Sequence, residues 1–192
     1  MILASKSPRR KEILESFDMK LEIKTADIDE SSNEIKPSKQ VEEIAYKKAI
    51  KIANENKKSY VLAADTVVVF ENNILGKPKD EKDAYDMLKK MSGKVHEVIT
   101  GYVFLNLEKK IEIISHNRTK VYMRDFDEEK INWYIATKEP MDKAGAYGIQ
   151  GKGNILIDKI DGDFFNVMGF PLSKFINDLE INGISLEEIK KL

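Results

Sequence analysis

The chain has 192 residues, 42% hydrophobic and 34% charged, so it can bury a core and is too apolar to be disordered. Its 32 Lys and Arg residues against 33 Asp and Glu give a net charge of -1, which disfavours broad, non-specific nucleic-acid binding. The absence of Cys excludes disulfides, thiolate metal sites and a Cys nucleophile.

The first apolar run, Ile2 to Ala4, predicts a short strand followed by a tight turn and a helix. Ser7 is a suitable N-cap for that helix, and Pro8 suits its first position. Its inward stripe is predicted to be Ile13, Leu14 and Phe17. Leu21 to Ala26 predicts a second strand, and the polar segment Asp27 to Pro37 predicts a loop.

Ser38 is predicted to cap a long helix that runs to about Asn56. Its buried face, at helical spacing, is Val41, Ile44, Ala45, Ala49, Ile52 and Ala53. Tyr60 to Phe70 is nearly continuous in apolar and β-branched residues, which predicts a strand buried on both faces. A turn at Glu71 to Asn73 leads into the short strand Ile74-Leu75.

Asp80 to Met91 predicts a helix that ends near Gly93. Val95 to Leu107 and Ile111 to Tyr122 predict two long strands, and their short connection implies antiparallel pairing. Asp127 is predicted to cap a further helix that runs to about Lys138.

The rest of the chain predicts a strand at Ile155 to Ile160, a helix from Pro171 to about Ile181, and a short helical tail. Trp133 and Phe17 are assigned to the core. Because helices alternate with strands while two long strands pair antiparallel, we expect a mixed α/β sheet rather than an all-parallel one.

The Ser5 to Arg10 segment is the first candidate site. The chain has only four Arg residues, and Arg9 and Arg10 stand side by side at a predicted helix start. The free N–H groups and dipole of such a start attract anions, and a guanidinium matches phosphate oxygens. A phosphate-binding turn is one interpretation, and a solvated first turn with ordinary surface arginines is the other.

Asp65 is the second candidate, because a carboxylate in a buried strand is costly unless it is paired, hydrogen-bonded or metal-bound. It is therefore a candidate general base or cation ligand, unless it lies at a sheet edge or faces solvent.

Lys48, the third candidate, shares a helical face with Ile44 and Ile52. It either extends outward to solvent or points toward carboxylates or phosphates.

Two glycine-containing loops complete the candidates. Gly76 and Pro78 hold Lys77 between them in a turn, which is either plain or a phosphate contact. Four of the ten glycines lie between Gly145 and Gly153, in a pattern that is neither a P-loop nor GxGxxG. We expect a shaped binding loop there, in which Gln150 offers both a donor and an acceptor to a base edge.

Several familiar site types are absent from the sequence. His96 and His116 are the only histidines and lack the HExxH spacing, and no GxSxG motif is present. No apolar run approaches the about 20 residues of a membrane span. The start of the chain lacks a secretory signal, so we expect a cytoplasmic protein.

Taken together, these residues resemble the Maf family of nucleoside triphosphate pyrophosphatases, and in particular its dTTP/UTP pyrophosphatase branch. The resemblance rests on seven blocks in order along nearly the whole chain: Leu3 to Arg10, Ala45 to Ala49, Ala64 to Val68, Leu75 to Pro78, His96 to Gly101, Glu139 to Gly151 and Asn166 to Leu172. Phe170 stands where the family usually carries Leu, and we expect only a packing change there.

The resemblance implies a housekeeping, metal-dependent hydrolase that cuts a nucleoside triphosphate between its α- and β-phosphates, giving the monophosphate and pyrophosphate. It implies one domain over residues 1–192, with an elongated, twisted mixed sheet flanked by helices and two lobes around a central cleft, as in inosine triphosphatase-like enzymes. It makes Asp65 the catalytic proton acceptor. Base specificity falls on Arg9, Thr66 and Gln150, and phosphate binding on Ser5, Arg10, Lys48 and Lys77.

Glu30 and Asp65 are expected to hold Mg²⁺ or Mn²⁺, with Asp27 and Asp29 as neighbours of Glu30 in the same loop. The expected partner is a dTTP, UTP or modified pyrimidine substrate, without nucleic acid or membrane, and the family suggests a homodimer. One alternative is the 7-methyl-GTP pyrophosphatase branch, which the three specificity positions disfavour. Another is a non-catalytic nucleotide-sensing regulator of cell division, which the intact acidic residues disfavour.

Overall fold

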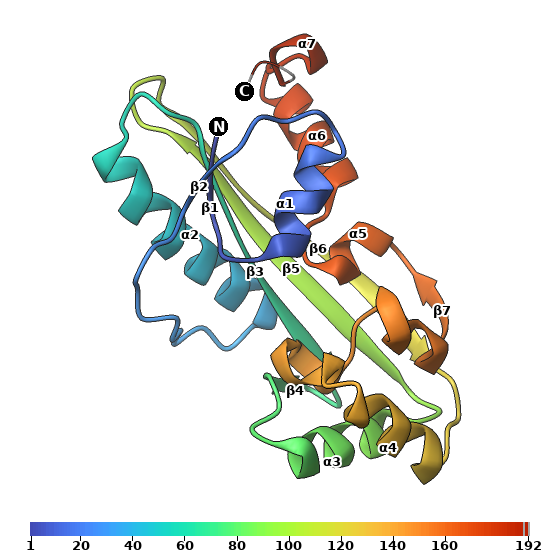
Figure 1. The fold of residues 1–192 in the computed structure, drawn as a ribbon. Coiled ribbons are helices and arrows are strands. Elements are labelled where there is room, and N and C mark those ends of the chain that lie inside the picture. Colours follow the sequence, from blue (N-terminus) through green and yellow to red (C-terminus); the bar gives the residue numbers. More distant parts are fainter. Residues whose placement is uncertain (190, 192) are drawn as a thin grey trace. The chain divides into compact units, whose positions relative to one another are not determined.

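The computed structural model describes residues 1–189 and 191. Within them, seven strands form one sheet in the order β2-β1-β3-β5-β6-β7, with β4 paired to β3 off this path (Figure 1). The strands are β1 (Ile2–Ala4), β2 (Glu22–Lys24), β3 (Val61–Phe70), β4 (Asn73–Leu75), β5 (Val95–Asn106), β6 (Ile111–Met123) and β7 (Ile157–Asp161). β1 is parallel to β2 and β3, whereas β4 and β7 are antiparallel to β3 and β6. The prediction of a mixed sheet is confirmed.

The helices agree with the predicted positions in most cases (Figure 1). They are α1 (Pro8–Glu15), α2 (Pro37–Glu55), α3 (Glu81–Met91), α4 (Glu128–Ala136), α5 (Phe164–Met168), α6 (Leu172–Ile181) and α7 (Leu186–Ile189). Three 3-10 turns lie between α4 and β7: η1 (Glu139–Asp142), η2 (Ala144–Ala146) and η3 (Gly151–Leu156). No helix in the described part of the chain is both long and apolar enough to cross a membrane.

Helix starts follow the predicted capping chemistry at two of three positions. Ser7 and Asp127 each accept a hydrogen bond from a backbone N–H of the first helical turn, and Asp80 does the same for α3, where no cap was predicted. The prediction that Ser38 caps α2 is wrong, because Pro37 already occupies the first helical position and Lys36 precedes it without a side-chain cap. The fixed φ of proline starts the helix at that point.

Two compact units divide the chain. The first comprises residues 1–66, 100–117 and 169–192, and the second comprises residues 67–99 and 118–168. β3, β5 and β6 therefore contribute residues to both units.

In the first unit, α2 packs on one face of the sheet. All its predicted inward positions are buried, and they meet strand residues in a core of Ile2, Ala4, Ala45, Ala49, Ile52, Ala53, Val61, Ala63, Val103 and Leu105. A Cβ at Gly101 on β5 would lie 2.7 Å from the Val41 carbonyl carbon, so glycine allows α2 to approach the strand closely. On the other strand face, Phe175 of α6 makes edge contacts with Tyr102 and Phe104 at centroid distances of 5.6 Å.

In the second unit, α3 packs against α4, and the buried face of α4 is Ile131, Tyr134 and Ile135. The assignment of Trp133 to the core is wrong, since it is 48% exposed. Trp133 follows Ile131 by two positions, which places it on the opposite side of the helix.

Three further predictions need correction. Phe17 is only half-buried, because α1 ends before it and Met19 fills the core instead. The strand predicted from Ile155 starts at Ile157, after the 3-10 turn η3. The five-residue helix α5 was not predicted, since it is too short to show a helical period.

Candidate active site

Asp65 and Thr66 lie at the carboxyl end of the parallel strands of the first unit. Leu3 of β1 pairs with Leu62 of β3, so the two site residues stand three and four positions further along β3. The chain leaves β1 at this same end through Ser5 and enters α1. Ligands of α/β sheets bind at the carboxyl ends of parallel strands.

The guanidinium of Arg10 is held on three sides. Its Nη2 donates to Thr66 Oγ1 at 3.0 Å, its Nη1 to Ser5 Oγ at 3.3 Å, and its Nε to the Gly169 carbonyl oxygen at 2.9 Å. Thr66 Oγ1 also lies 2.9 Å from Oγ1 of the fully buried Thr100. This network fixes the orientation of a planar cation that would otherwise sample many rotamers.

The charge of Arg10 is part of a wider cluster. Burial is the main influence on the pKa of Arg10 and lowers it from its usual value. The Asp65 carboxylate and, to a smaller extent, Glu30 raise this pKa, whereas the charge of Arg9 lowers it. The guanidinium stays protonated because its ordinary pKa is so high. The first turn of α1 carries no acidic residue, so no carboxylate of that turn offsets its positive dipole end.

Lys48 of α2 joins two carboxylates. Its Nζ lies 2.8 Å from Asp65 Oδ1 and 3.1 Å from Glu30 Oε1. The Lys48 and Asp65 side chains are only 11% and 16% exposed. Lys48 therefore turns inward rather than extending to solvent. Asp29, the neighbour of Glu30, instead accepts hydrogen bonds from the backbone and hydroxyl of Ser31.

Lys77 and Gln150 belong to the second unit. Lys77 is exposed in the loop after β4, and Gln150 is half-buried directly before η3. The Gly145 amide donates to the Gly76 carbonyl oxygen at 3.0 Å, so the Lys77 loop and the glycine-rich segment lie side by side. The Gln150 amide has no hydrogen-bond partner among the described residues, which leaves it available to a ligand.

The carboxylates of Asp65 and Glu30 are oxygen donors of the kind that Mg²⁺ prefers. No group of three His, Cys, Asp or Glu side chains that could hold a metal occurs in the described ranges. Mg²⁺ at nucleotide sites takes one or two carboxylates and completes its shell with phosphate oxygens and water. Two carboxylates that already converge on the Lys48 ammonium meet that requirement.

The residues that sequence reasoning missed are Thr100 and Gly169, which hold Arg10 and Thr66 from distant positions. Gly169 has φ +119°, a backbone conformation that favours glycine. The available signal was that Thr100 and Gly169 each lie in a block that carries the family resemblance, which does not indicate the residues they contact.

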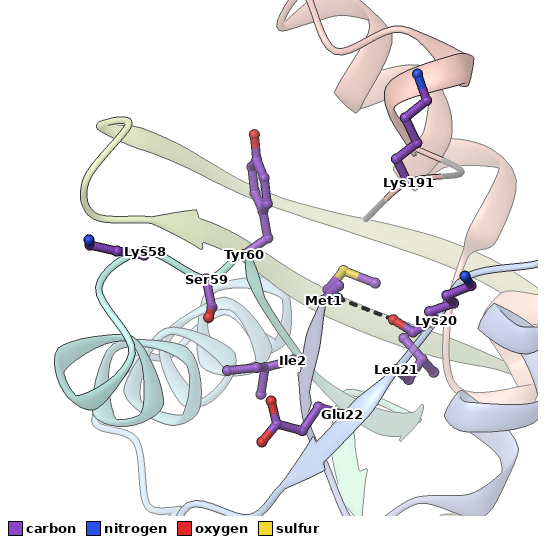
Figure 2. A pocket seen from close by; sticks show the side chains of 9 residues that line it. All are labelled: Met1, Ile2, Lys20, Leu21, Glu22, Lys58, Ser59, Tyr60 and Lys191. Atoms are coloured by element: carbon purple, nitrogen blue, oxygen red, sulfur yellow. Dashed lines mark hydrogen bonds between the residues drawn. The ribbon is translucent and has the colours of Figure 1, made fainter.

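Two hollows lie away from these residues. One, with a volume of about 420 Å³, lies at the amino end of β1 (Figure 2). There the Met1 ammonium donates to the Lys20 carbonyl oxygen at 3.1 Å. Lys58 and Tyr60 also line it. The other, of about 590 Å³, is in the second unit beside Tyr122. None of the candidate site residues lines either hollow.

The fold is shared with a known class of α/β protein. The solved Ham1 protein of Staphylococcus aureus matches with a TM-score of 0.50 at 14% identity, covering 81% of this chain and 78% of that chain. At this identity the match shows the fold alone, and it agrees with the inosine triphosphatase-like architecture expected from the sequence.

Residues 1–181 match the family described as Maf-like protein, and the chain belongs to that family. A relative from Fusobacterium nucleatum is 47% identical over 192 residues and is fully covered. A relative from Alkaliphilus metalliredigens is 51% identical over 176 residues, which is 91% of each chain. Both are named dTTP/UTP pyrophosphatase.

Proposed function

We propose that this chain is a nucleoside triphosphate pyrophosphatase that hydrolyses dTTP and UTP to the monophosphate and pyrophosphate. The names of its relatives support the activity. The observation that carries the proposal is the pairing of Asp65 with Lys48, 2.8 Å apart, in the same charge cluster as the immobilised Arg10. A carboxylate held among fixed cations can act as a general base while the cations stabilise the charge that develops on phosphate oxygens.

Arg10, Ser5 and Lys48 are proposed to bind phosphate in the first unit. A triphosphate carries about four negative charges, which fixed guanidinium and ammonium groups neutralise without reorganising. In the absence of substrate, Ser5 Oγ accepts from Arg10 and from the Ser7 amide. Lys77, a residue of the second unit, is likewise proposed to bind phosphate.

Asp65 is proposed to act as the general base. Lys48 occupies its Oδ1, while Oδ2 has no hydrogen-bond partner among the described residues and can accept a proton from water. The water oxygen bonds to the α-phosphorus, the bond from that phosphorus to the bridging oxygen breaks and releases pyrophosphate, and the water proton passes to Asp65. Lys48 orients the carboxylate during this transfer.

Glu30 and Asp65 are proposed to hold Mg²⁺ or Mn²⁺. When bound, the ion would offset negative charge on the triphosphate. Glu30, at 62% side-chain exposure, can turn toward such an ion with little loss of packing.

Arg9, Thr66 and Gln150 are the proposed specificity positions. Gln150 suits base recognition directly, because its side chain has an amide donor and a carbonyl acceptor. The hydroxyl of Thr66 is engaged by Arg10 and Thr100, so Thr66 has a second task in orienting Arg10.

We further propose that the chain is cytoplasmic and forms a homodimer. Its proposed substrates are free nucleotides rather than nucleic acid. The family resemblance supports the location and the dimer, and the net charge of -1 supports the absence of nucleic-acid binding. Sedimentation at several protein concentrations tests the dimer.

The test of the activity is pyrophosphate release from dTTP, UTP, dATP, dGTP and 7-methyl-GTP, each with Mg²⁺, with Mn²⁺ and with a chelator. We expect dTTP and UTP to be the best substrates and the chelator to abolish turnover. Faster turnover of 7-methyl-GTP would assign the chain to the other branch. Nucleotide binding without pyrophosphate release would support a sensor instead of an enzyme.

A further inference from the structure

The backbone of the segment that carries Gln150 is held by hydrogen bonds to two side chains of the second unit, Tyr134 and Glu139. On one side of Gln150, the Gly148 amide donates to Tyr134 Oη at 3.1 Å. On the other side, the amides of Lys152 and Gly153 donate to the Glu139 carboxylate, each at 3.1 Å. Gln150 therefore stands between two fixed points only a few residues apart.

Tyr134 and Glu139, the two side chains that anchor the segment, are also hydrogen-bonded to each other. Tyr134 Oη donates to Glu139 Oε1 at 3.1 Å, so one hydroxyl accepts from the loop and donates to the carboxylate. Tyr134 is fully buried on α4, and burial raises the pKa of its phenol, so the proton needed for this bond is present at neutral pH.

The glycines of the segment make this fastening possible. A Cβ at Gly151, where φ is +68°, would lie 3.0 Å from Glu139 Oε2. A Cβ at Gly153 would lie 2.6 Å from Tyr134 Oη. Side chains at either position would displace the anchors, which explains physically why glycines cluster around Gln150.

We propose that Glu139 is a positioning residue for base selection, acting with Tyr134 through the backbone of residues 148–153 to set the direction of Gln150. The inference rests on the proposed function, in which Gln150 contacts the base. A carboxylate is suited to this task because it accepts from two backbone N–H groups at once. Glutamine is nearly the same size, but its NH₂ group would face one of these donors.

The experiment compares Glu139→Gln, Gln150→Ala and the double variant, with Glu129→Gln as a control, because Glu129 is exposed on the neighbouring α4. The measurement is kcat and KM for dTTP and dATP. We expect Glu139→Gln to lower the dTTP preference by about tenfold, mainly through KM for dTTP, since even a misplacement of about 1 Å can cost up to about 100-fold. The double variant should match Gln150→Ala, and Glu129→Gln should match the wild type.

Unchanged selectivity in Glu139→Gln, while Gln150→Ala loses it, would overturn this inference and leave the proposed function standing. Additive losses in the double variant would also overturn it. Absence of pyrophosphate release by the wild type would instead reject the proposed function.

Hydrogen exchange gives a readout that does not need activity. In Glu139→Gln and in Tyr134→Phe, amide exchange over residues 148–153 should rise about tenfold while β3 remains protected. If Glu139→Gln does not fold, Tyr134→Phe carries the same test through its lost hydroxyl. Wild-type protection of this segment in both variants would contradict the anchoring.

Discussion

Asp65 and Thr66 are neighbours on β3 and serve opposite faces of the sheet. Asp65 pairs with Lys48 of α2 at 2.8 Å, whereas Thr66 accepts from Arg10 of α1 at 3.0 Å. Because successive side chains of a strand alternate, one dipeptide connects a carboxylate to one helix and a hydroxyl to another. The proposed general base, Asp65, is therefore adjacent in the chain to the residue that orients the proposed phosphate-binding Arg10.

Asp65→Asn should leave the chain folded and able to bind dTTP while lowering kcat by about 100-fold or more, the scale of lost acid–base catalysis. The amide keeps the shape of the side chain and cannot take up the proton of water. Pyrophosphate release and thermal unfolding measure the two effects. Glu112→Gln, an exposed position on β6, is the control. Near-normal turnover in Asp65→Asn would remove it from the mechanism.

Thr66→Val should lower kcat/KM about tenfold for dATP, through the lost hydrogen bond to the Arg10 charge, and further for dTTP, because Thr66 is also a proposed specificity position. The variant loses the oxygen that accepts from Arg10, and the phosphates that Arg10 is proposed to bind are common to all triphosphates. Thr66→Ser keeps the hydroxyl and should retain most activity. A loss confined to one base would instead mean that Thr66 acts mainly in base selection.

His96 makes the second unit sensitive to acid. It is 2% exposed, its Nε2 lies 2.6 Å from Tyr147 Oη, and burial lowers its pKa from 6.5 to about 4. The unfolded chain therefore takes up this proton first as pH falls, and stability is lost between about pH 6.5 and 4. Over about 2.5 pH units at about 1.4 kcal/mol each, the contribution is roughly 3 kcal/mol.

Urea unfolding of the wild type and His96→Gln from pH 7 to pH 4 measures this contribution. The wild type should lose roughly 3 kcal/mol more than the variant over that range, because glutamine does not titrate. If both proteins lost the same free energy of unfolding over this pH range, the pKa of His96 would not be lowered in the folded state.

Gly101→Ala should destabilise the first unit by about 1–3 kcal/mol, the usual cost of overpacking. The added Cβ would lie 2.7 Å from the Val41 carbonyl carbon, so α2 must move, and Lys48 is on the same helix. Gly76→Ala is the matched control, because nothing lies within 4 Å of its added Cβ. Equal urea midpoints for the two variants would contradict the close packing of α2.

Local sequence patterns determined most of the secondary structure. The Ser7-Pro8 start of α1, the inward face of α2 and the buried strand that holds Asp65 were all predictable, because capping, helical periodicity and β-branched runs act over a few residues. Local patterning was insufficient at Trp133, whose large side chain suggested the core although the stripe through Ile131 and Tyr134 turns it outward.

The candidate residues were also visible in the sequence, but their pairings were not. Only the tertiary structure showed that Lys48 lies between Glu30 and Asp65, and that Arg10 is held by a residue 159 positions away. The free-energy gain from such contacts depends on strand register and helix docking, which are set by the packing of the whole unit. Side-chain chemistry alone identifies a group that can react, and packing decides which group it meets.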